Sequence, residues 1–422
     1  MRRAKGAREL IFDGIDAITD LVHKSHVEVA ERWTKRAKRV PGVEPVAESV
    51  HAVHMAGATV NYATVKFISR GVGAVLGMVT DPLLKDGNEA VTPLREDEAG
   101  STSWVLDHLE CSLNGFIGDH LARQGNCLDL GMHLRHKGRA ISPESLNAEF
   151  PNKTAKVCVF IHGLSATEWS WVFYAESLWG DSTSCYAKKL EEDLDYTCLF
   201  VRYNTGRHVS ENGQALSELL EKISTHYSIP IEQIVLVGHS MGGLVARSAA
   251  HEGQRSNAIW VEQLKHVVCL GSPHLGAPLE KGAHLLSAVL KHIPAAGATV
   301  PASIINCRSE GIKDLRHGYI TEDEWRDADV DALFDDKRQD LPLVRGVNYT
   351  AFAATVSKQP EHPIGQLVGD FLVRKFSAFG GAPETKHDMH FQNREIFAGL
   401  NHLHLANHPE VYEKLLVLLD EE

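Results

Sequence analysis

A serine between glycines is the part of this sequence best suited to chemistry. Residues 238–242 read Gly-His-Ser-Met-Gly, the pattern G-x-S-x-G, between an apolar run, "QIVLV", and a helix-forming run, "LVARSAA". A strand, a tight turn and a helix in that order would lift the Ser240 hydroxyl above the edge of a sheet, beside a helix N-terminus that stabilises negative charge. Glycines at 238 and 242 relieve contacts that a Cβ would make. The pattern therefore indicates a nucleophilic serine.

A serine nucleophile needs a base and donors for the oxyanion that forms on attack. One donor is expected from the backbone N–H of Met241, directly after the serine. The segment "VFIHGL" (159–164) ends an apolar run at a glycine, so the N–H of Leu164 could point at the same place. We expect His162 to be a structural residue of this turn, because it precedes the serine. The residues expected to shape the two turns are His162, Gly163, Gly238, His239 and Gly242.

Three histidines fall within seven positions near the C-terminus, in "HLHLANH" (402–408). Such a cluster suggests a metal site, a proton-transfer group or a polar loop. Zinc sites need three or four ligands, and no HExxH or Cys/His spacing occurs, so no metal is expected. His408 precedes a proline that suits the first turn of a helix, which favours a capping role. The histidines considered as the base are His387, His390, His402, His404 and His408.

Apolar runs rich in Val, Leu and Phe recur from residue 128 onward, with helical patterns between them. Short runs without alternation are typical of strands buried on both faces of a parallel sheet, and strand–helix alternation predicts an α/β fold. The first run alternates and predicts an antiparallel strand. The predicted strands are 128–138, 156–163, 196–204, 233–240, 264–272 and 347–356.

The alternation pauses between about 276 and 345, where the sequence is helical and increasingly acidic. We interpret this insertion as a cap over the carboxyl edge of the sheet, where α/β proteins bind ligands. Residues 1–82 are predicted to form a helical extension, because the spacing of Ile11, Ile15, Ile18 and Val22 gives one apolar stripe along a helix. Residues 83–103 read as a polar linker, and residues 104–422 form the main domain.

The N-terminal segment differs in charge from the rest of the chain. Residues 1–40 hold ten Lys/Arg and six Asp/Glu, a net charge of +4, whereas the whole chain carries −12. This charge and the apolar stripe are consistent with peripheral membrane or subunit contact through residues 1–80. The longest apolar stretch there, 71–79, is shorter than the roughly 20 residues of a membrane span.

The composition excludes several classes of protein. The 422 residues are 43% hydrophobic and 23% charged, as in ordinary globular proteins, and the net negative charge argues against nucleic acid as a partner. Seven scattered cysteines without a CxxC pair suit a reducing compartment. With no secretory signal recognised, we expect a cytoplasmic location, with association to the inner membrane face left open. No P-loop or dinucleotide fingerprint occurs, so no cofactor is expected.

The segments "HGL", "GHSMGG" and "GSPHLGAP" (271–278) resemble the α/β-hydrolase superfamily, specifically its lipase and esterase branch, which includes the GPI-inositol-deacylase-like group. The resemblance covers roughly residues 125–418, so neither the N-terminal helices nor the variable cap inherits a role from it. It implies an α/β-hydrolase fold with a mostly parallel sheet, and a catalytic serine, acid and histidine in that order along the chain.

The same resemblance implies which residues assist Ser240. Asp370 lies in "GDFLV", which is similar to the G-D-G-x-V segment that carries the acid in related lipases, although Phe371 replaces the second glycine. The rival acids Asp314, Asp331 and Asp388 fall in the cap or in a His-rich loop. The ending "HLHLANHPEVY" resembles one in which the first histidine is the base, which implies His402, with His404 as the rival.

Together these features predict hydrolysis of a carboxylic ester or lipid through an acyl-enzyme. Ser240 is the expected nucleophile, with His402 as the base and Asp370 as its partner. The N–H groups of Leu164 and Met241 are the expected oxyanion donors. An acyltransferase or thioesterase would use the same residues. A non-catalytic, membrane-associated scaffold with this fold is the alternative from a different class.

Overall fold

The computed structural model separates the chain into two compact units, residues 1–92 with 125–128, and residues 93–124 with 129–422. The predicted N-terminal extension lies outside the described residues, apart from Val27 and Thr34, which are helical. No helix among the described residues is long and apolar enough to cross a membrane. The described residues are Val27, Thr34, 102–277, 309–326, 337–358, Asp370, 373–381 and 388–420.

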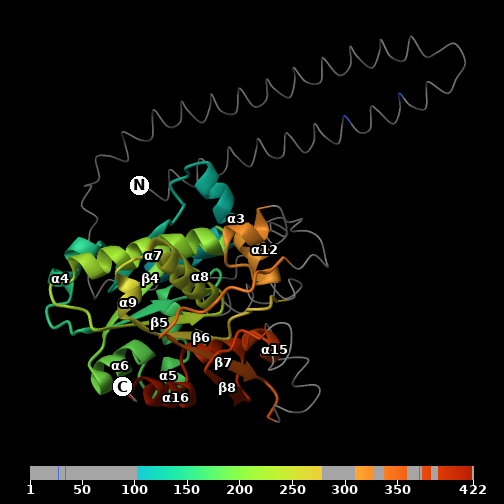
Figure 1. The fold of residues 1–422 in the computed structure, drawn as a ribbon. Helices are drawn as coiled ribbons and strands as arrows, with labels where there is room; N and C mark the ends of the chain where they lie inside the picture. The colour runs from blue at the N-terminus through green and yellow to red at the C-terminus, as the bar shows by residue number, and fades with distance from the viewer. Residues whose placement is uncertain are drawn as a thin grey trace, which may run out of the picture. The chain divides into compact units, whose positions relative to one another are not determined.

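An eight-stranded sheet forms the centre of this unit, with strand order β2-β1-β4-β3-β5-β6-β7-β8 (Figure 1). Strand β1 pairs antiparallel with β2 and β4, and every other pairing is parallel. The predicted α/β fold with a mostly parallel sheet is confirmed. The strands are β1 Met132–His136, β2 Arg139–Ile141, β3 Lys156–Ile161, β4 Thr197–Tyr203, β5 Gln233–His239, β6 Leu264–Leu270, β7 Asn348–Thr355 and β8 Asn393–Ala398.

Burial on both faces explains the apolar strand sequences. All seven residues of β5 are buried, and so are the last five residues of β3. One hydrophobic core lies between the sheet and the helices α7 and α8, and a second lies between the opposite face and α6 and α16 (Figure 1). The longer helices are α3 Thr102–Arg123, α6 Tyr186–Leu194, α7 Val209–His226, α8 Met241–Ser256, α12 Glu310–His317 and α16 Pro409–Asp420.

The remaining elements are short. Four of them are α-helical turns of the main domain, one is the second described helix of the predicted cap, and three are 3₁₀ turns. They are η1 Pro143–Ser145, α4 Leu146–Glu149, η2 Glu168–Val172, α5 Ala175–Trp179, α9 Trp260–Gln263, α13 Glu322–Trp325, α15 Lys375–Ala378 and η4 His402–Ala406.

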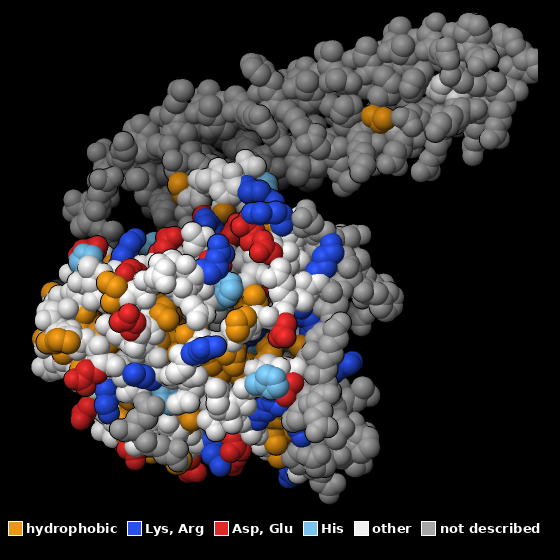
Figure 2. All heavy atoms as spheres, in the orientation of Figure 1, with side chains coloured by type: hydrophobic (Ala, Val, Ile, Leu, Met, Phe, Trp, Pro, Cys, Tyr) orange, Lys and Arg blue, Asp and Glu red, His pale blue; other side chains and the backbone are white. Residues whose placement is uncertain are grey.

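Helix α3 and strand β8 are among the elements that the sequence does not predict. Helix α3 begins at Thr102, so the last two residues of the predicted linker are helical. Strand β8 closes one edge of the sheet and keeps mostly half-exposed side chains, so its sequence, "NREIFA", shows no apolar run. On the face drawn in Figure 2, acidic and basic side chains of the described residues are interspersed.

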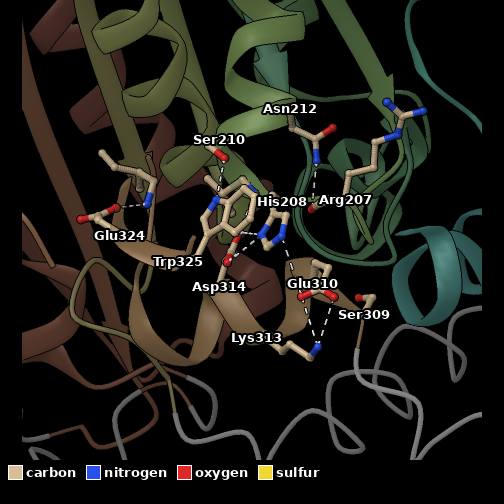
Figure 3. Close-up of polar contacts among 12 residues, drawn as sticks. Arg207, His208, Ser210, Asn212, Ser309, Glu310, Lys313, Asp314, Glu324 and Trp325 are labelled. Carbon is tan, nitrogen blue, oxygen red and sulfur yellow. Dashed lines mark hydrogen bonds and ion pairs between the residues drawn. The ribbon is translucent and has the colours of Figure 1, made fainter. Parts of the chain in front are cut away.

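Residues 309–326 of the predicted cap are anchored to the start of α7 (Figure 3). His208 Nδ1 lies 3.0 Å from Asp314 Oδ2, and the His208 ring stacks on Trp325 with ring centroids 3.6 Å apart. The Asp314 carboxylate also accepts the Val209 N–H at 2.8 Å, and Trp325 Nε1 donates to Ser210 Oγ at 3.0 Å. We call this cluster of His208, Val209, Ser210, Asp314 and Trp325 the cap anchor. Asp314 is therefore a structural residue of the cap anchor.

Candidate active site

Ser240 occupies a strained turn between β5 and α8. Its backbone angles are φ 55° and ψ −120°, and its N–H donates to the Leu270 carbonyl at 2.8 Å. A non-glycine residue in such a conformation costs about 1–3 kcal/mol, which the surrounding structure must offset. The serine is only 6% exposed. The turn therefore holds the hydroxyl at the carboxyl end of β5, at the N-terminus of a helix.

The glycines of this turn are required by close approaches of the backbone. A Cβ on Gly242 would lie 2.1 Å from the Ile161 carbonyl oxygen, and one on Gly238 would lie 2.4 Å from the Gly243 nitrogen. A Cβ on Gly163 would lie 3.0 Å from the Cβ of Ser240. The serine turn is thus packed directly against the end of β3 and the loop that follows.

His402 and Asp370 form a buried pair. His402 Nδ1 lies 2.7 Å from Asp370 Oδ2, and the His402 N–H donates to the Asp370 carbonyl at 3.3 Å. The other carboxylate oxygen of Asp370 accepts the Val373 N–H at 2.7 Å. A proton on Nδ1, shared with the carboxylate, leaves the lone pair on Nε2, which is the arrangement that a general base requires.

No hydrogen bond joins Ser240 to His402 in the described part of the chain. His402 Nε2 is buried and has no hydrogen-bond partner. Both residues nevertheless contact the residues at the end of β6. A Cβ on Gly271 would lie 3.1 Å from the His402 ring, and Leu270 accepts the Ser240 N–H. Catalytic hydrogen bonds often tighten only when substrate is bound.

His239 connects the serine turn to the histidine loop. Its Nε2 donates to the His402 carbonyl at 3.0 Å, and the two ring centroids are 4.7 Å apart. Burial, and then the neighbouring His402, lowers the pKa of His239 to about 3, so its imidazole is neutral at ordinary pH. His239 is therefore a supporting residue and not a base.

His162 belongs to the turn after β3. Its Nδ1 lies 2.9 Å from the Gly163 carbonyl, and its own carbonyl accepts the Tyr203 hydroxyl at 2.8 Å. The His162 and Tyr203 rings stack with centroids 4.6 Å apart. Burial lowers the pKa of His162 to about 4. These contacts fix the turn that presents Leu164.

The two expected oxyanion donors flank the serine. Met241 is the first residue of α8, where a backbone N–H has no partner within the helix. Leu164 follows Gly163, which approaches Ser240 closely. Neither N–H donates to an acceptor among the residues described. Both are therefore available to a developing negative charge, and the oxyanion role stays a prediction.

A small apolar pocket adjoins Ser240. Its lining residues include Gly163, Leu164, Phe173, Ser240 and Leu403. Its cavity volume is about 10 Å³, which is enough for about one water molecule. The described walls therefore leave a narrow space beside the serine.

The other candidate histidines have different surroundings. The His404 N–H donates to Asn401 Oδ1 at 3.0 Å, His404 Nδ1 accepts the Asn401 N–H at 3.3 Å, and its ring packs edge-on against Tyr174 at 4.6 Å. The His408 N–H donates to Tyr186 Oη at 2.8 Å, directly before α16. His390 is exposed, with Nδ1 3.3 Å from Asp388. His387 lies outside the described residues.

Among the rival acids, Asp314 belongs to the cap anchor and Asp388 pairs with Arg394 and His390. Asp331 lies outside the described residues. In the described ranges, no three His, Cys, Asp or Glu side chains are grouped so that they could hold a metal ion. The absence of a metal and of a cofactor from the mature protein stays a prediction.

The sheet and the serine turn define the class of protein. A mostly parallel sheet with an antiparallel edge, and a serine at a tight turn between β5 and the following helix, form the α/β-hydrolase fold. Residues 155–332 match the family model described as "PGAP1-like alpha/beta domain". This match, over less than half of the chain, agrees with the resemblance to the α/β-hydrolase superfamily. No curated protein matches the sequence.

Several solved structures are similar to this chain at low identity. The Bacillus licheniformis lipase BlEst2 is 18% identical, with 64% of this chain and 93% of that chain covered and a TM-score of 0.39. A lipase-esterase related protein from Clostridium acetobutylicum is 12% identical, with coverages of 68% and 98% and a TM-score of 0.32. The Legionella pneumophila phospholipase PlaB is 14% identical, with 63% of each chain covered and a TM-score of 0.36. Likenesses of this degree carry no conclusion about chemistry.

Proposed function

We propose that the protein is a serine hydrolase that cleaves carboxylic esters through an acyl-enzyme. The observation that carries the proposal is the buried contact of 2.7 Å between His402 Nδ1 and Asp370 Oδ2. It orients an imidazole whose Nε2 has no hydrogen-bond partner, on a loop joined to the serine turn through His239. A strained serine, an oriented imidazole and unpaired N–H groups together suit acyl transfer.

In the proposed reaction Ser240 Oγ attacks the ester carbonyl carbon, and its proton passes to His402 Nε2. The N–H groups of Leu164 and Met241 donate to the oxygen that becomes negatively charged. His402 then gives the proton to the leaving alcohol oxygen as the ester C–O bond breaks, which leaves an acyl group on Ser240. Water attacks this acyl-enzyme with His402 again as base, and the carboxylic acid is released.

Replacing Ser240 by alanine tests this mechanism. We expect the turnover of a p-nitrophenyl ester to fall by about 10⁴- to 10⁶-fold, because the nucleophile is lost. Thermal unfolding should show an intact fold, since alanine keeps the Cβ. A fluorophosphonate probe should label the unmodified protein at Ser240 and fail to label the variant. Turnover retained by the variant would remove the serine mechanism, and an unlabelled wild-type protein would favour the non-catalytic scaffold.

The acyl group and the acceptor are separate questions within this proposal. A series of p-nitrophenyl esters distinguishes an esterase from a lipase, since a maximum at acetyl to butyryl esters argues against a lipase. Thioester substrates test the thioesterase alternative. Transfer of the acyl group to an added alcohol in place of water tests the acyltransferase alternative.

The basic charge of residues 1–40 supports a second proposal about partners. We propose that residues 1–80 make peripheral contact with an anionic membrane surface, where an ester of a lipid would be found. Contact with a second subunit is the competing role for the same segment.

A further inference from the structure

Helix α3 lies directly against the loop that carries Leu164. A Cβ on Gly115 of α3 would lie 1.9 Å from Ser165 Oγ, 3.0 Å from its Cβ and 3.2 Å from its Cα. Rotation of the Ser165 hydroxyl would relieve the first contact but neither of the other two. Ser165 directly follows Leu164 and has a positive φ of 57°. Any side chain at position 115 would therefore push on the residue next to the expected oxyanion donor.

Two further contacts join α3 to the same loop. His108 Nε2 lies 3.2 Å from Thr167 Oγ1, and both residues are fully buried. Arg202 bridges α3 and the loop, because its Nη2 donates to Asp107 Oδ2 at 2.9 Å and to Glu168 Oε1 at 2.6 Å. Burial opposes the charge on Glu168, but the nearby arginines outweigh this effect and lower the pKa of its carboxyl. Residues 165, 167 and 168 are thus each tied to α3, directly or through Arg202.

The loop after β4 completes the contact. Thr205 Oγ1 accepts the Ser165 N–H at 3.1 Å, and Asn204 Nδ2 donates to the Gly118 carbonyl of α3 at 2.9 Å. Helix α3 bends at Ile117, which has non-helical angles of φ −134° and ψ 18°. Ser165 is therefore held from two sides, by α3 and by a loop that α3 also holds.

We propose that α3 is a positioning element for the oxyanion loop, and that the contact between Gly115 and Ser165 sets the direction of the Leu164 N–H. This inference rests on the proposed serine-hydrolase function. Helix α3 lies outside both the segment that resembles hydrolases and the matched residues 155–332. Oxyanion donors must lie close to the position of the developing charge, so a small displacement of the loop weakens the transition state more than the ground state.

The test is the steady-state kinetics of Gly115→Ala on a p-nitrophenyl ester. We expect kcat to fall by about 10- to 100-fold, the range that displacements approaching 1 Å produce, while KM changes little. The rate of Ser240 labelling by a fluorophosphonate should fall in parallel. Adding Ser165→Gly should restore most of kcat. Glycine removes the Oγ and Cβ that the new methyl group would meet, and it also suits the positive φ at this position.

Gly213→Ala is the matched control. A Cβ there would lie 2.1 Å from Ser248 Oγ, a similar glycine–serine contact between α7 and α8. This variant should lower thermal stability but leave kcat nearly unchanged. The inference is overturned if Gly115→Ala keeps the wild-type kcat, if Gly213→Ala lowers kcat equally, or if Ser165→Gly restores nothing.

A second variant covers the case in which Gly115→Ala does not fold. His108→Ala removes the contact with Thr167 without adding volume, and we expect a fall in kcat of about tenfold with little change in KM, as for a modest loss of orientation. An unchanged kcat in this variant would also contradict the inference. Failure of the proposed function would be distinguishable, because the wild-type protein would then neither turn over ester nor bind the fluorophosphonate.

Discussion

At the scale of single residues, neighbouring histidines differ in what their side chains reach. His402 Nδ1 contacts a carboxylate at 2.7 Å, whereas His404 Nδ1 accepts a backbone N–H from Asn401 at 3.3 Å. The first arrangement leaves the lone pair of His402 on Nε2, while the carboxylate of Asp370 holds the other ring nitrogen, Nδ1. The second closes the cap of the 3₁₀ turn η4. The two imidazoles are therefore suited to different tasks.

Alanine at His402 should reduce kcat by about 10⁴-fold or more, because both the base and the contact of Asp370 are lost. Alanine at His404 should reduce kcat by less than about tenfold, through loosening of the η4 turn alone. Steady-state kinetics of the two variants on the same ester check this prediction. A larger loss from the change at His404 would reverse the assignment of the base.

At the scale of elements, the anchor between α7 and the described cap residues contains a titrating pair (Figure 3). Burial lowers the pKa of His208, but the hydrogen bond and charge of Asp314 outweigh this effect and raise it. Burial raises the pKa of Asp314 to about 6. Glu310 also faces the imidazole, with Oε2 3.8 Å from His208 Nε2. The folded anchor therefore holds protons more tightly than the unfolded chain does.

Because both pKa values are raised on folding, the folded protein binds more protons at these two groups, and their contribution to stability falls as the pH rises, first through about 6 for Asp314. It should be lost as the pH rises past about 6.5, the ordinary pKa of histidine, and through the raised pKa of His208. We expect His208→Asn to destabilise the protein by about 1–3 kcal/mol near pH 6, as for a hydrogen bond to a charged group. Thermal unfolding at several pH values should show this difference shrinking toward alkaline pH.

Ser210→Ala provides the control for this prediction. It removes the hydrogen bond from Trp325 Nε1 at 3.0 Å, in the same anchor, but takes away no titrating group. Its effect on the free energy of unfolding should be independent of pH over the same range. Parallel pH profiles for the two variants would mean that His208 acts by stacking on Trp325 and not by its charge.

At the scale of the whole molecule, charge is divided unevenly along the chain. The net charge of +4 in residues 1–40 leaves −16 on the remainder of a chain whose total is −12. The face in Figure 2 carries interspersed charges of both signs among its described residues. We propose that attraction to an anionic surface acts through residues 1–40, whose net charge is opposite in sign to that of the remainder.

We expect the full-length protein to sediment with vesicles that contain phosphatidylserine and to be released by salt, since screening weakens such contacts. Replacing Lys35, Arg36, Lys38 and Arg39 by glutamine should abolish this binding. Vesicles of phosphatidylcholine alone serve as the control. A variant that binds vesicles as before but changes its oligomeric state in light scattering would point to subunit contact instead.

The sequence by itself determined the parts of the protein whose local pattern reports their environment. Strands β3, β5 and β6 are buried on both faces, so their sequences are continuous apolar runs. The serine turn was recognisable from its glycines. They are needed because a Cβ at these positions would lie closer to neighbouring backbone atoms than ordinary contact distance. Strand β8 was not predicted, because an edge strand with half-exposed side chains has no continuous apolar run in its sequence.

Only the tertiary structure decided how distant segments combine. The resemblance had already implied Asp370, and in the structure its 2.7 Å contact with His402, 32 residues later, distinguishes it from Asp314 and Asp388. Gly115 is a poor residue for a helix interior, and nothing in its local sequence explains it. The reason is Ser165, fifty positions away, against which α3 packs. Sequence patterns reflect local burial and backbone geometry, whereas the contacts that orient a site depend on which elements the fold brings together.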